Sequence, residues 1–143
     1  MTPPDPFDLA RFVTAQEQVY PFALAEIRDG YKVSHWMWFI FPQFAGLGSS
    51  SMAQRFAIKS VAEAEAYLAH PTLGPRLVEC CEAALAVDGK SAISIFGTPD
   101  DMKLRSCVTL FDAISPGGVF GRVLAKYYAG EPDRRTLTLI GRV

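Results

Sequence analysis

The sequence predicts a compact all-α, multihelical single domain, and three observations support this fold class. The chain has 143 residues, of which 50% are hydrophobic and 20% are charged, a balance that suits one globular domain and argues against disorder. Apolar residues recur at helical spacing along most of the chain, and several segments carry their own start or stop signal. The Pro-rich residues 1–6 are expected to be a flexible leader before a helical domain over residues 7–143. The alternative is an α+β fold with a small sheet built from residues 36–41, 91–96 and 136–140.

Helical spacing begins just after Asp8, whose side chain can cap the first exposed backbone amides. The residues that follow this period are Leu9, Phe12, Val13 and Gln16. Pro21 lacks a backbone N–H and disfavours the helical conformation of the preceding residue, so we expect a kink or a break there. A second helical piece over residues 22–29 is expected to end at Gly30, which can adopt the left-handed conformation that closes a helix.

An aromatic segment follows, from Trp36 to Phe41, with six large apolar residues and no polar face. We expect it to be buried on nearly every side, either as a short helical turn capped by Ser34 or as a strand. The next residues, Gly46-Leu-Gly-Ser-Ser-Ser51, predict a loop. Such a loop can present backbone amides to a phosphate, although a plain connection has the same composition.

The second half of the chain carries the clearest helix signals. Ser60-Val-Ala-Glu63 is a capping box, in which the serine side chain and the glutamate satisfy the first amides of a helix. Thr98-Pro-Asp-Asp101 predicts a second capping box, with proline at the first helical position where its missing donor costs little. Two last helices are expected over residues 119–128 and 134–140, with Asp133 as the cap of the second.

Charge and cysteine usage exclude several classes of function. The formal net charge is -1, which gives no general electrostatic case for binding nucleic acid or an acidic membrane. No apolar run approaches the length of a membrane helix, and the N-terminus lacks the pattern of a secretory signal. The cysteines, Cys80, Cys81 and Cys107, are odd in number and lack metal-ligand spacing, so we expect buried thiols in a reducing cytoplasm, no metal and no cofactor.

The segment Ser34-His-Trp-Met-Trp-Phe-Ile-Phe-Pro-Gln-x-x-Gly-Leu-Gly48 resembles the signature of a bacterial family known as domain of unknown function 1810. The resemblance runs from Phe7 to Leu139. Further similar motifs are Phe12-Val-x-Ala-Gln16, Leu73-Gly-x-Arg76-Leu77, Phe96-Gly-x-x-Asp100-x-x-Lys103-Leu-x-Ser106 and Asp133-x-x-Thr136-Leu137. The resemblance implies a multihelical domain, leaves open a homodimeric state and supplies no established activity. Family members are often labelled calpastatin-like, but calpastatin-type inhibitors are repetitive and disordered, whereas this chain is apolar and non-repetitive.

The candidate functional residues surround the aromatic segment. His35 abuts two tryptophans and is the expected proton-transfer group if the protein is an enzyme, with Lys103 stabilising an anion. A histidine bonded to a nearby carbonyl in the fold is the plainer reading of His35. The expected ligand-binding residues are Trp36, Trp38, Gln43, Arg105, Gln16 and Tyr67. Lys103 and Arg105 lie about 200° apart on a helix, so we expect only one of them to face a small site.

The function that these residues favour is the binding or hydrolysis of a small nucleotide-like metabolite in one pocket. Families tied to NAD and ADP-ribose metabolism also use small helical domains with tryptophan and polar residues around a pocket, but no motif can be matched residue by residue, so no roles are carried over. The alternative is a non-enzymatic module whose aromatic segment forms a dimer interface or a partner groove. A third reading makes every motif residue a strut of the fold, and whether the protein is an enzyme stays open.

Overall fold

Helices supply the regular structure of the computed structural model, which describes residues 4–142. Among these residues the only pairing of strand type is one isolated parallel bridge, between Phe44 and Ile58. The helices are α1 (Ala10–Gln16), α2 (Tyr20–Arg28), α3 (Met37–Ile40), α4 (Ser51–Arg55), α5 (Val61–Ala69), α6 (Leu73–Ala86), α7 (Ala92–Phe96), α8 (Asp100–Ile114), α9 (Val119–Tyr128) and α10 (Arg134–Leu139). The all-α prediction is therefore confirmed, and the α+β alternative is wrong.

The three segments considered as strands form α3, α7 and α10. Local capping explains two of them, because a side chain accepts the backbone N–H three residues on and so favours the first helical turn. Ser91 accepts the N–H of Ser94 ahead of α7, and Asp133 accepts the N–H of Thr136 ahead of α10. The expected cap at Asp133 is thereby confirmed.

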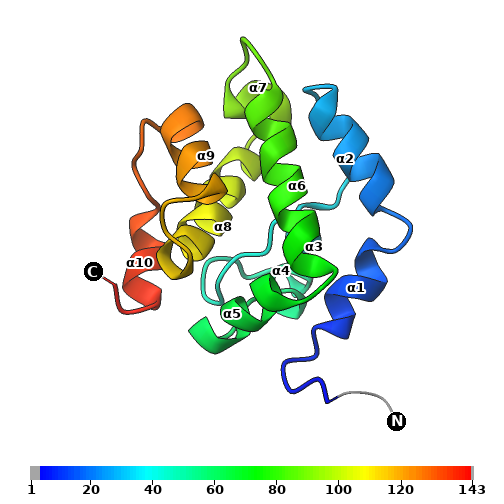
Figure 1. Cartoon of the computed structure of the whole chain (residues 1–143), viewed down its shortest axis with the longest axis vertical. Helices are drawn as coiled ribbons and strands as arrows, with labels where there is room; N and C mark the ends of the chain where they lie inside the picture. The colour runs from blue at the N-terminus through cyan, green and yellow to red at the C-terminus, as the bar shows by residue number, and fades with distance from the viewer. Residues whose placement is uncertain (1–3, 143) are drawn as a thin grey trace.

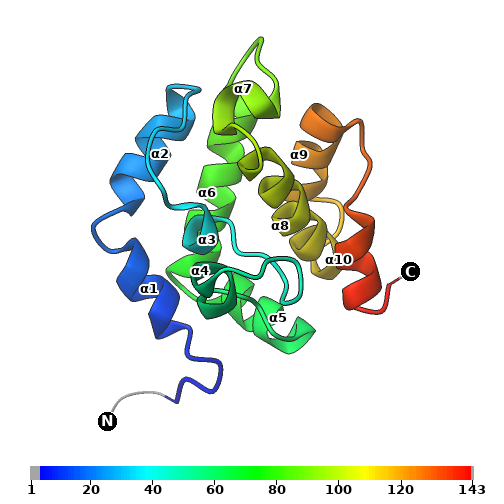
Figure 2. The ribbon, with the colours of Figure 1, turned by 180° about the vertical axis from the view of Figure 1, so that it is seen from behind.

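The helices pack around α6, which runs through the middle of Figure 1 with α1 and α2 on one side and α8, α9 and α10 on the other. Figure 2 shows the opposite face, where α3, α4 and the connection between them lie between α1 and the pair formed by α8 and α10. This connection is held by the bridge to Ile58: the N–H of Ile58 donates to the carbonyl of Gln43, and the N–H of Ala45 donates to that of Ile58. The aromatic segment and the loop after it are thus placed beside the first turns of α8.

The first helix is capped by a different aspartate from the one predicted. Asp5 accepts the N–H groups of Leu9 at 2.8 Å and Ala10 at 2.9 Å, and these bonds lower the pKa of its carboxyl group. Asp8 instead takes a left-handed backbone conformation, with φ of +52°. Asp5 belongs to the expected leader; residues 1–3 of that leader lie outside the described residues, and its flexibility stays a prediction.

Other local signals behave as the sequence predicts, with two exceptions. No side chain caps α3, and Ser34, its expected cap, instead donates its hydroxyl to Glu26 at 2.8 Å. α1 ends before Pro21, which stands in the first turn of α2, and Gly30 closes α2 with φ of +72°. Ser60 accepts the N–H of Glu63 at 3.0 Å, the first half of a capping box, and the Glu63 carboxylate accepts the N–H of Lys59 at 3.0 Å in place of that of Ser60. The capping box at Thr98 is wrong: α8 begins at Asp100 after Pro99, and no side chain caps it.

The core contains the aromatic segment and all three cysteines. Trp36, Phe41 and the thiols are shielded from solvent, and the cysteines are free. Burial raises the pKa of the Cys81 and Cys107 thiols, which makes them poor nucleophiles. Among residues 4–142, no His, Cys, Asp or Glu side chains gather in threes as a metal site requires. No helix within this part of the chain is long and apolar enough to cross a membrane.

Candidate functional site

Glu26 on α2 fixes the segment that leads into α3. Its carboxylate accepts the N–H groups of Val33 and Ser34 at 2.8 and 2.9 Å, the Ser34 hydroxyl at 2.8 Å and the indole N–H of Trp36 at 3.0 Å. Burial raises the pKa of Glu26, but the hydrogen bonds from Ser34, Val33 and Trp36 outweigh it and lower the pKa to about 2. The buried Trp36 is therefore an anchor that sets where the next tryptophan, Trp38, emerges.

We expect acid to weaken this anchor. A carboxyl group whose pKa is about 2 in the folded protein, against 4.5 when unperturbed, stabilises the fold fully above pH 4.5 and loses that contribution as the pH falls toward 2. Urea unfolding between pH 7 and pH 2.5 should therefore show a smaller acid-induced loss of stability in Glu26→Gln than in the wild type. The matched control is Glu65→Gln on the exposed face of α5, which should keep the wild-type profile. An unchanged pH dependence in Glu26→Gln would contradict the account.

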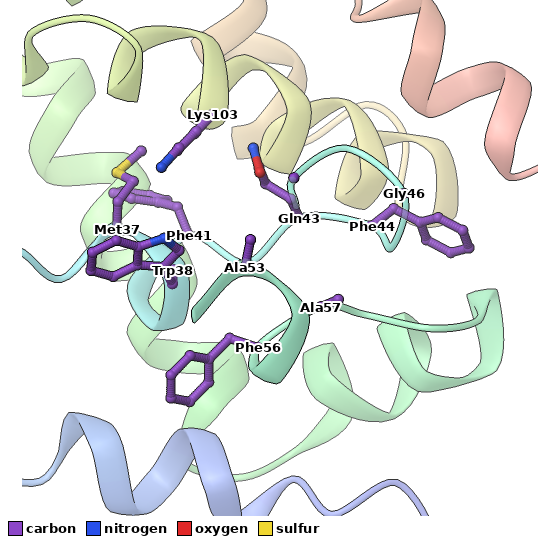
Figure 3. Close-up of a pocket in the computed structure, with 11 residues that line it drawn as sticks. Met37, Trp38, Phe41, Gln43, Phe44, Gly46, Ala53, Phe56, Ala57 and Lys103 are labelled. Carbon is purple, nitrogen blue, oxygen red and sulfur yellow. The ribbon is translucent and has the colours of Figure 1, made fainter. Parts of the chain in front are cut away.

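Trp38, Gln43 and Lys103 meet at a small cavity between α3 and α8 (Figure 3). Lys103 reaches from α8 toward the indole of Trp38, and the Gln43 side chain projects from the connection toward α8. The cavity is about 20 Å³, room for one water molecule, and its floor is the apolar surface of Met37 and Phe41. Gln43 and Lys103, which are 60 residues apart in the sequence, thus line the same cavity. The sequence interpretation placed both of them in one site.

Lys103 sits in a locally cationic environment. Its ammonium lies 3.7 Å from Asp100 and 5.2 Å from the centre of the Trp38 ring. Asp100 also pairs with Lys32 at 2.8 Å, and the Lys32 ammonium lies 4.9 Å from the centre of the Trp36 ring. One carboxylate is therefore shared by two ammonium groups, and an anion bound beside Lys103 would meet a net positive charge.

A larger groove adjoins the cavity and shares Gln43, Gly48, Ala53 and Lys103 with it. Its volume is about 420 Å³, within the range of about 300 to 1,000 Å³ typical of small-molecule sites. The lining combines the 47–50 loop, the first turns of α8 and the start of α10; the polar members are Gln43, Ser49, Ser50, Lys103, Arg105, Ser106, Asp133 and Arg135. A Cβ on Gly48 would lie 2.7 Å from the Cβ of Ala53, so the loop needs glycine to sit this close to α4.

Two arginines give the groove most of its charge. Arg105 donates to the backbone carbonyls of Glu131 at 2.9 Å and Pro132 at 3.2 Å, which leaves its second terminal nitrogen without a recorded partner among residues 4–142. Arg135 is exposed, and within residues 4–142 its side chain donates only to the carbonyl of Gly46, at 3.4 Å. With Lys103, three cationic side chains line the groove against the single carboxylate of Asp133. Asp133 is already engaged, since it accepts hydrogen bonds at the start of α10.

Lys103 and Arg105 both line the wide groove, whereas of the two only Lys103 lines the small cavity, so the expectation that they do not share one small site is not contradicted. Met102 and Ser106 are one turn apart on α8, and both line the groove. Around the helix axis, Lys103 and Arg105 each point about 80° away from the mean direction of these two residues, on opposite sides. Long side chains on both flanks of a helix can reach the same groove when the groove is as wide as the helix face. The sequence interpretation assumed a site smaller than the one that the loop and α10 form.

The other predicted residues lie outside the groove. His35 is exposed and lines neither the cavity nor the groove. Gln16 and Tyr67 are buried in the core, where the Gln16 amide donates to the carbonyl of Phe39 at 2.7 Å and to the hydroxyl of Tyr67 at 3.2 Å. The sequence interpretation also missed Arg135, an arginine on an exposed helix face that carries no signal in the sequence.

Comparison with known proteins identifies relatives. The family model described as "Protein of unknown function (DUF1810)" matches residues 6–140. The chain is similar to the crystal structure of the conserved hypothetical protein Rv1873 from Mycobacterium tuberculosis, with 53% sequence identity and a TM-score of 0.94 over 96% of this chain and 99% of that one. Among curated proteins, none matches the chain.

Proposed function

The chain belongs to the DUF1810 family of proteins of unknown function, and we propose that it binds a small, phosphorylated, nucleotide-like metabolite in the groove between α8, α10 and the 47–50 loop. The observation that carries this proposal is the convergence of Lys103, Arg105 and Arg135 on one groove of ligand size. Cationic side chains in such a groove favour phosphate, and the fork of an arginine can bind two phosphate oxygens at once.

The end of the groove nearest Trp38 offers polar groups to such a ligand. Trp38 itself does not line the groove: its cavity of about 20 Å³ is too small for a heteroaromatic ring, and the Lys103 ammonium lies 5.2 Å from the centre of its ring, so the indole positions Lys103. The Gln43 side chain makes no recorded hydrogen bond within residues 4–142, so its amide is available to donate to and accept from a ring edge or a hydroxyl. Gln43 and Lys103 lie at this end of the groove and Arg105 and Arg135 at the end shared with the neighbouring groove, and together they would bind the ring edge and the phosphate of a nucleotide.

The proposal covers binding and not hydrolysis. His35, the proton-transfer group expected from the sequence, is not among the residues that line the groove. The overall charge of -1 gives no general electrostatic case for nucleic acid, whereas three cationic side chains line this groove, which favours a small anion. We also propose a cytoplasmic location, on the three free buried cysteines. Trp36 and Phe41 are buried within the chain, and a homodimer through some other surface stays a prediction.

A thermal-shift and titration experiment tests the proposal. AMP, ADP or ADP-ribose at about a hundredfold above its Kd should stabilise the protein by about 2.7 kcal/mol and raise the unfolding midpoint by roughly 10 °C, whereas adenosine should raise it far less. Lys103→Gln should weaken nucleotide binding by about tenfold or more, the effect of one charge-assisted contact.

The matched control is Arg122→Gln on α9, which removes the same charge from an exposed position outside the groove. It should bind nucleotides as tightly as the wild type. The proposal is wrong if none of the three nucleotides shifts the midpoint, or if Arg122→Gln weakens binding as much as Lys103→Gln does.

A further inference from the structure

A second groove adjoins the first at the start of α10. Its volume is about 540 Å³, and it shares Arg105, Asp133 and Arg135 with the first groove. These shared side chains lie at the boundary between the two grooves, with Gln43 and Lys103 only in the lining of the first and Arg134 only in the lining of the second. An extended ligand could cross this boundary and occupy both grooves.

The second groove adds one cation that the first lacks, Arg134. This residue is exposed at the first position of α10, and its guanidinium takes part in none of the ion pairs or side-chain hydrogen bonds recorded for residues 4–142. The opposing charge is Glu131, whose side chain is 78% exposed and lies 3.8 Å from Arg105. A contact this exposed is weakly held, so Glu131 can turn aside when an anion approaches.

We infer that the ligand carries two adjacent phosphoryl groups bound at this boundary, one toward each groove, as in a nucleoside diphosphate or a pyrophosphate-linked nucleotide. The inference rests on the proposed function and names the class of ligand within it. Lys103 and Arg105 line the groove that would take the first phosphoryl group, and Arg134 lines the groove that would take the second. Arg135, shared by both grooves, lies where the bridging oxygen would cross.

Calorimetric titration of the full chain with AMP and with ADP tests the inference. The wild type should bind ADP about tenfold or more tightly than AMP, because the second phosphoryl group gains a charge-assisted contact. Arg134→Gln should remove this advantage and leave the affinity for AMP unchanged. Glu131→Gln removes the carboxylate that lies 3.8 Å from Arg105 and should raise the affinity for both AMP and ADP, which a purely structural role of this exposed turn would not do.

The outcomes separate this inference from the proposed function. Equal affinities for AMP and ADP, an ADP advantage that survives Arg134→Gln, or a lower ADP affinity in Glu131→Gln would overturn the inference and leave nucleotide binding in place. Absence of binding by AMP, ADP and ADP-ribose alike would overturn both. Equal unfolding midpoints of the variants and the wild type would show that the exposed substitutions act on the ligand and not on the fold.

Discussion

Arg11→Met is expected to lower the free energy of unfolding by about 3 to 5 kcal/mol, the usual cost of removing one partner of a buried ion pair. The Arg11 side chain is 11% exposed, and it pairs at 2.7 Å with Glu63, which is 3% exposed. All its donors are used: the remaining ones bind the carbonyls of Phe7, Asp8, Arg55 and Ala57. Arg11 thereby connects α1 to the segment between α4 and α5. Its loss leaves the buried Glu63 carboxylate without its cationic partner.

Urea unfolding measures this effect, with Arg55→Met as the matched control. Arg55 is an exposed arginine in the last turn of α4 that forms no recorded ion pair within residues 4–142, so its loss should cost less than about 1 kcal/mol. The double variant Arg11→Met with Glu63→Gln should be less destabilised than the sum of the two single variants, since it leaves no charge stranded. A loss in Arg11→Met as small as that in Arg55→Met would contradict this account.

Gly74→Ala is expected to destabilise the protein by about 2 to 3 kcal/mol, because the position has no room for a methyl group. A Cβ on Gly74 would lie 2.1 Å from the backbone carbonyl oxygen of Leu68, where α5 and α6 meet. A carbonyl in a helix cannot swing aside as a flexible side chain does, so the two helices must separate. The higher helix propensity of alanine, worth about 1 kcal/mol, recovers only part of the loss.

Gly118→Ala provides the control for this substitution. Gly118 precedes α9 with a negative φ, and a Cβ there would meet nothing within 4 Å. Thermal unfolding of the two variants should therefore show a clear fall of the midpoint for Gly74→Ala and little change for Gly118→Ala. A midpoint of Gly74→Ala at or above that of the wild type would mean that α5 and α6 can move apart freely.

The sequence predicts the helices well where the signal is local. Ser60, Gly30 and Asp133 were correctly identified because each acts on backbone groups within three residues. The cap predicted at Asp8 was wrong because Asp5, just outside the motif, accepts the N–H groups at the start of α1. The cap predicted at Thr98 was wrong because α8 starts after Pro99 without any side-chain cap.

The candidate site is predictable only in part, because spacing along a helix does not specify the shape of a groove. Trp38, Gln43 and Lys103, three of the candidate residues named from the sequence, line one cavity. A buried glutamine such as Gln16 looks the same in sequence whether it holds a ligand or, as here, a carbonyl of the core. Arg135 contributes through a long-range contact with the carbonyl of Gly46, which no local pattern reveals.

The most direct test of the central claim locates the bound nucleotide on the protein. In an NMR titration with ADP, we predict that the backbone amide signals of residues 47–50, 102–106 and 133–135 and the indole signal of Trp38 shift together and saturate at one Kd. The amides of α2 and the indole of Trp36, which lie away from the groove, should stay in place. Shifts confined to other surfaces, or no shifts at saturating ADP, would contradict the claim that this groove is a nucleotide site.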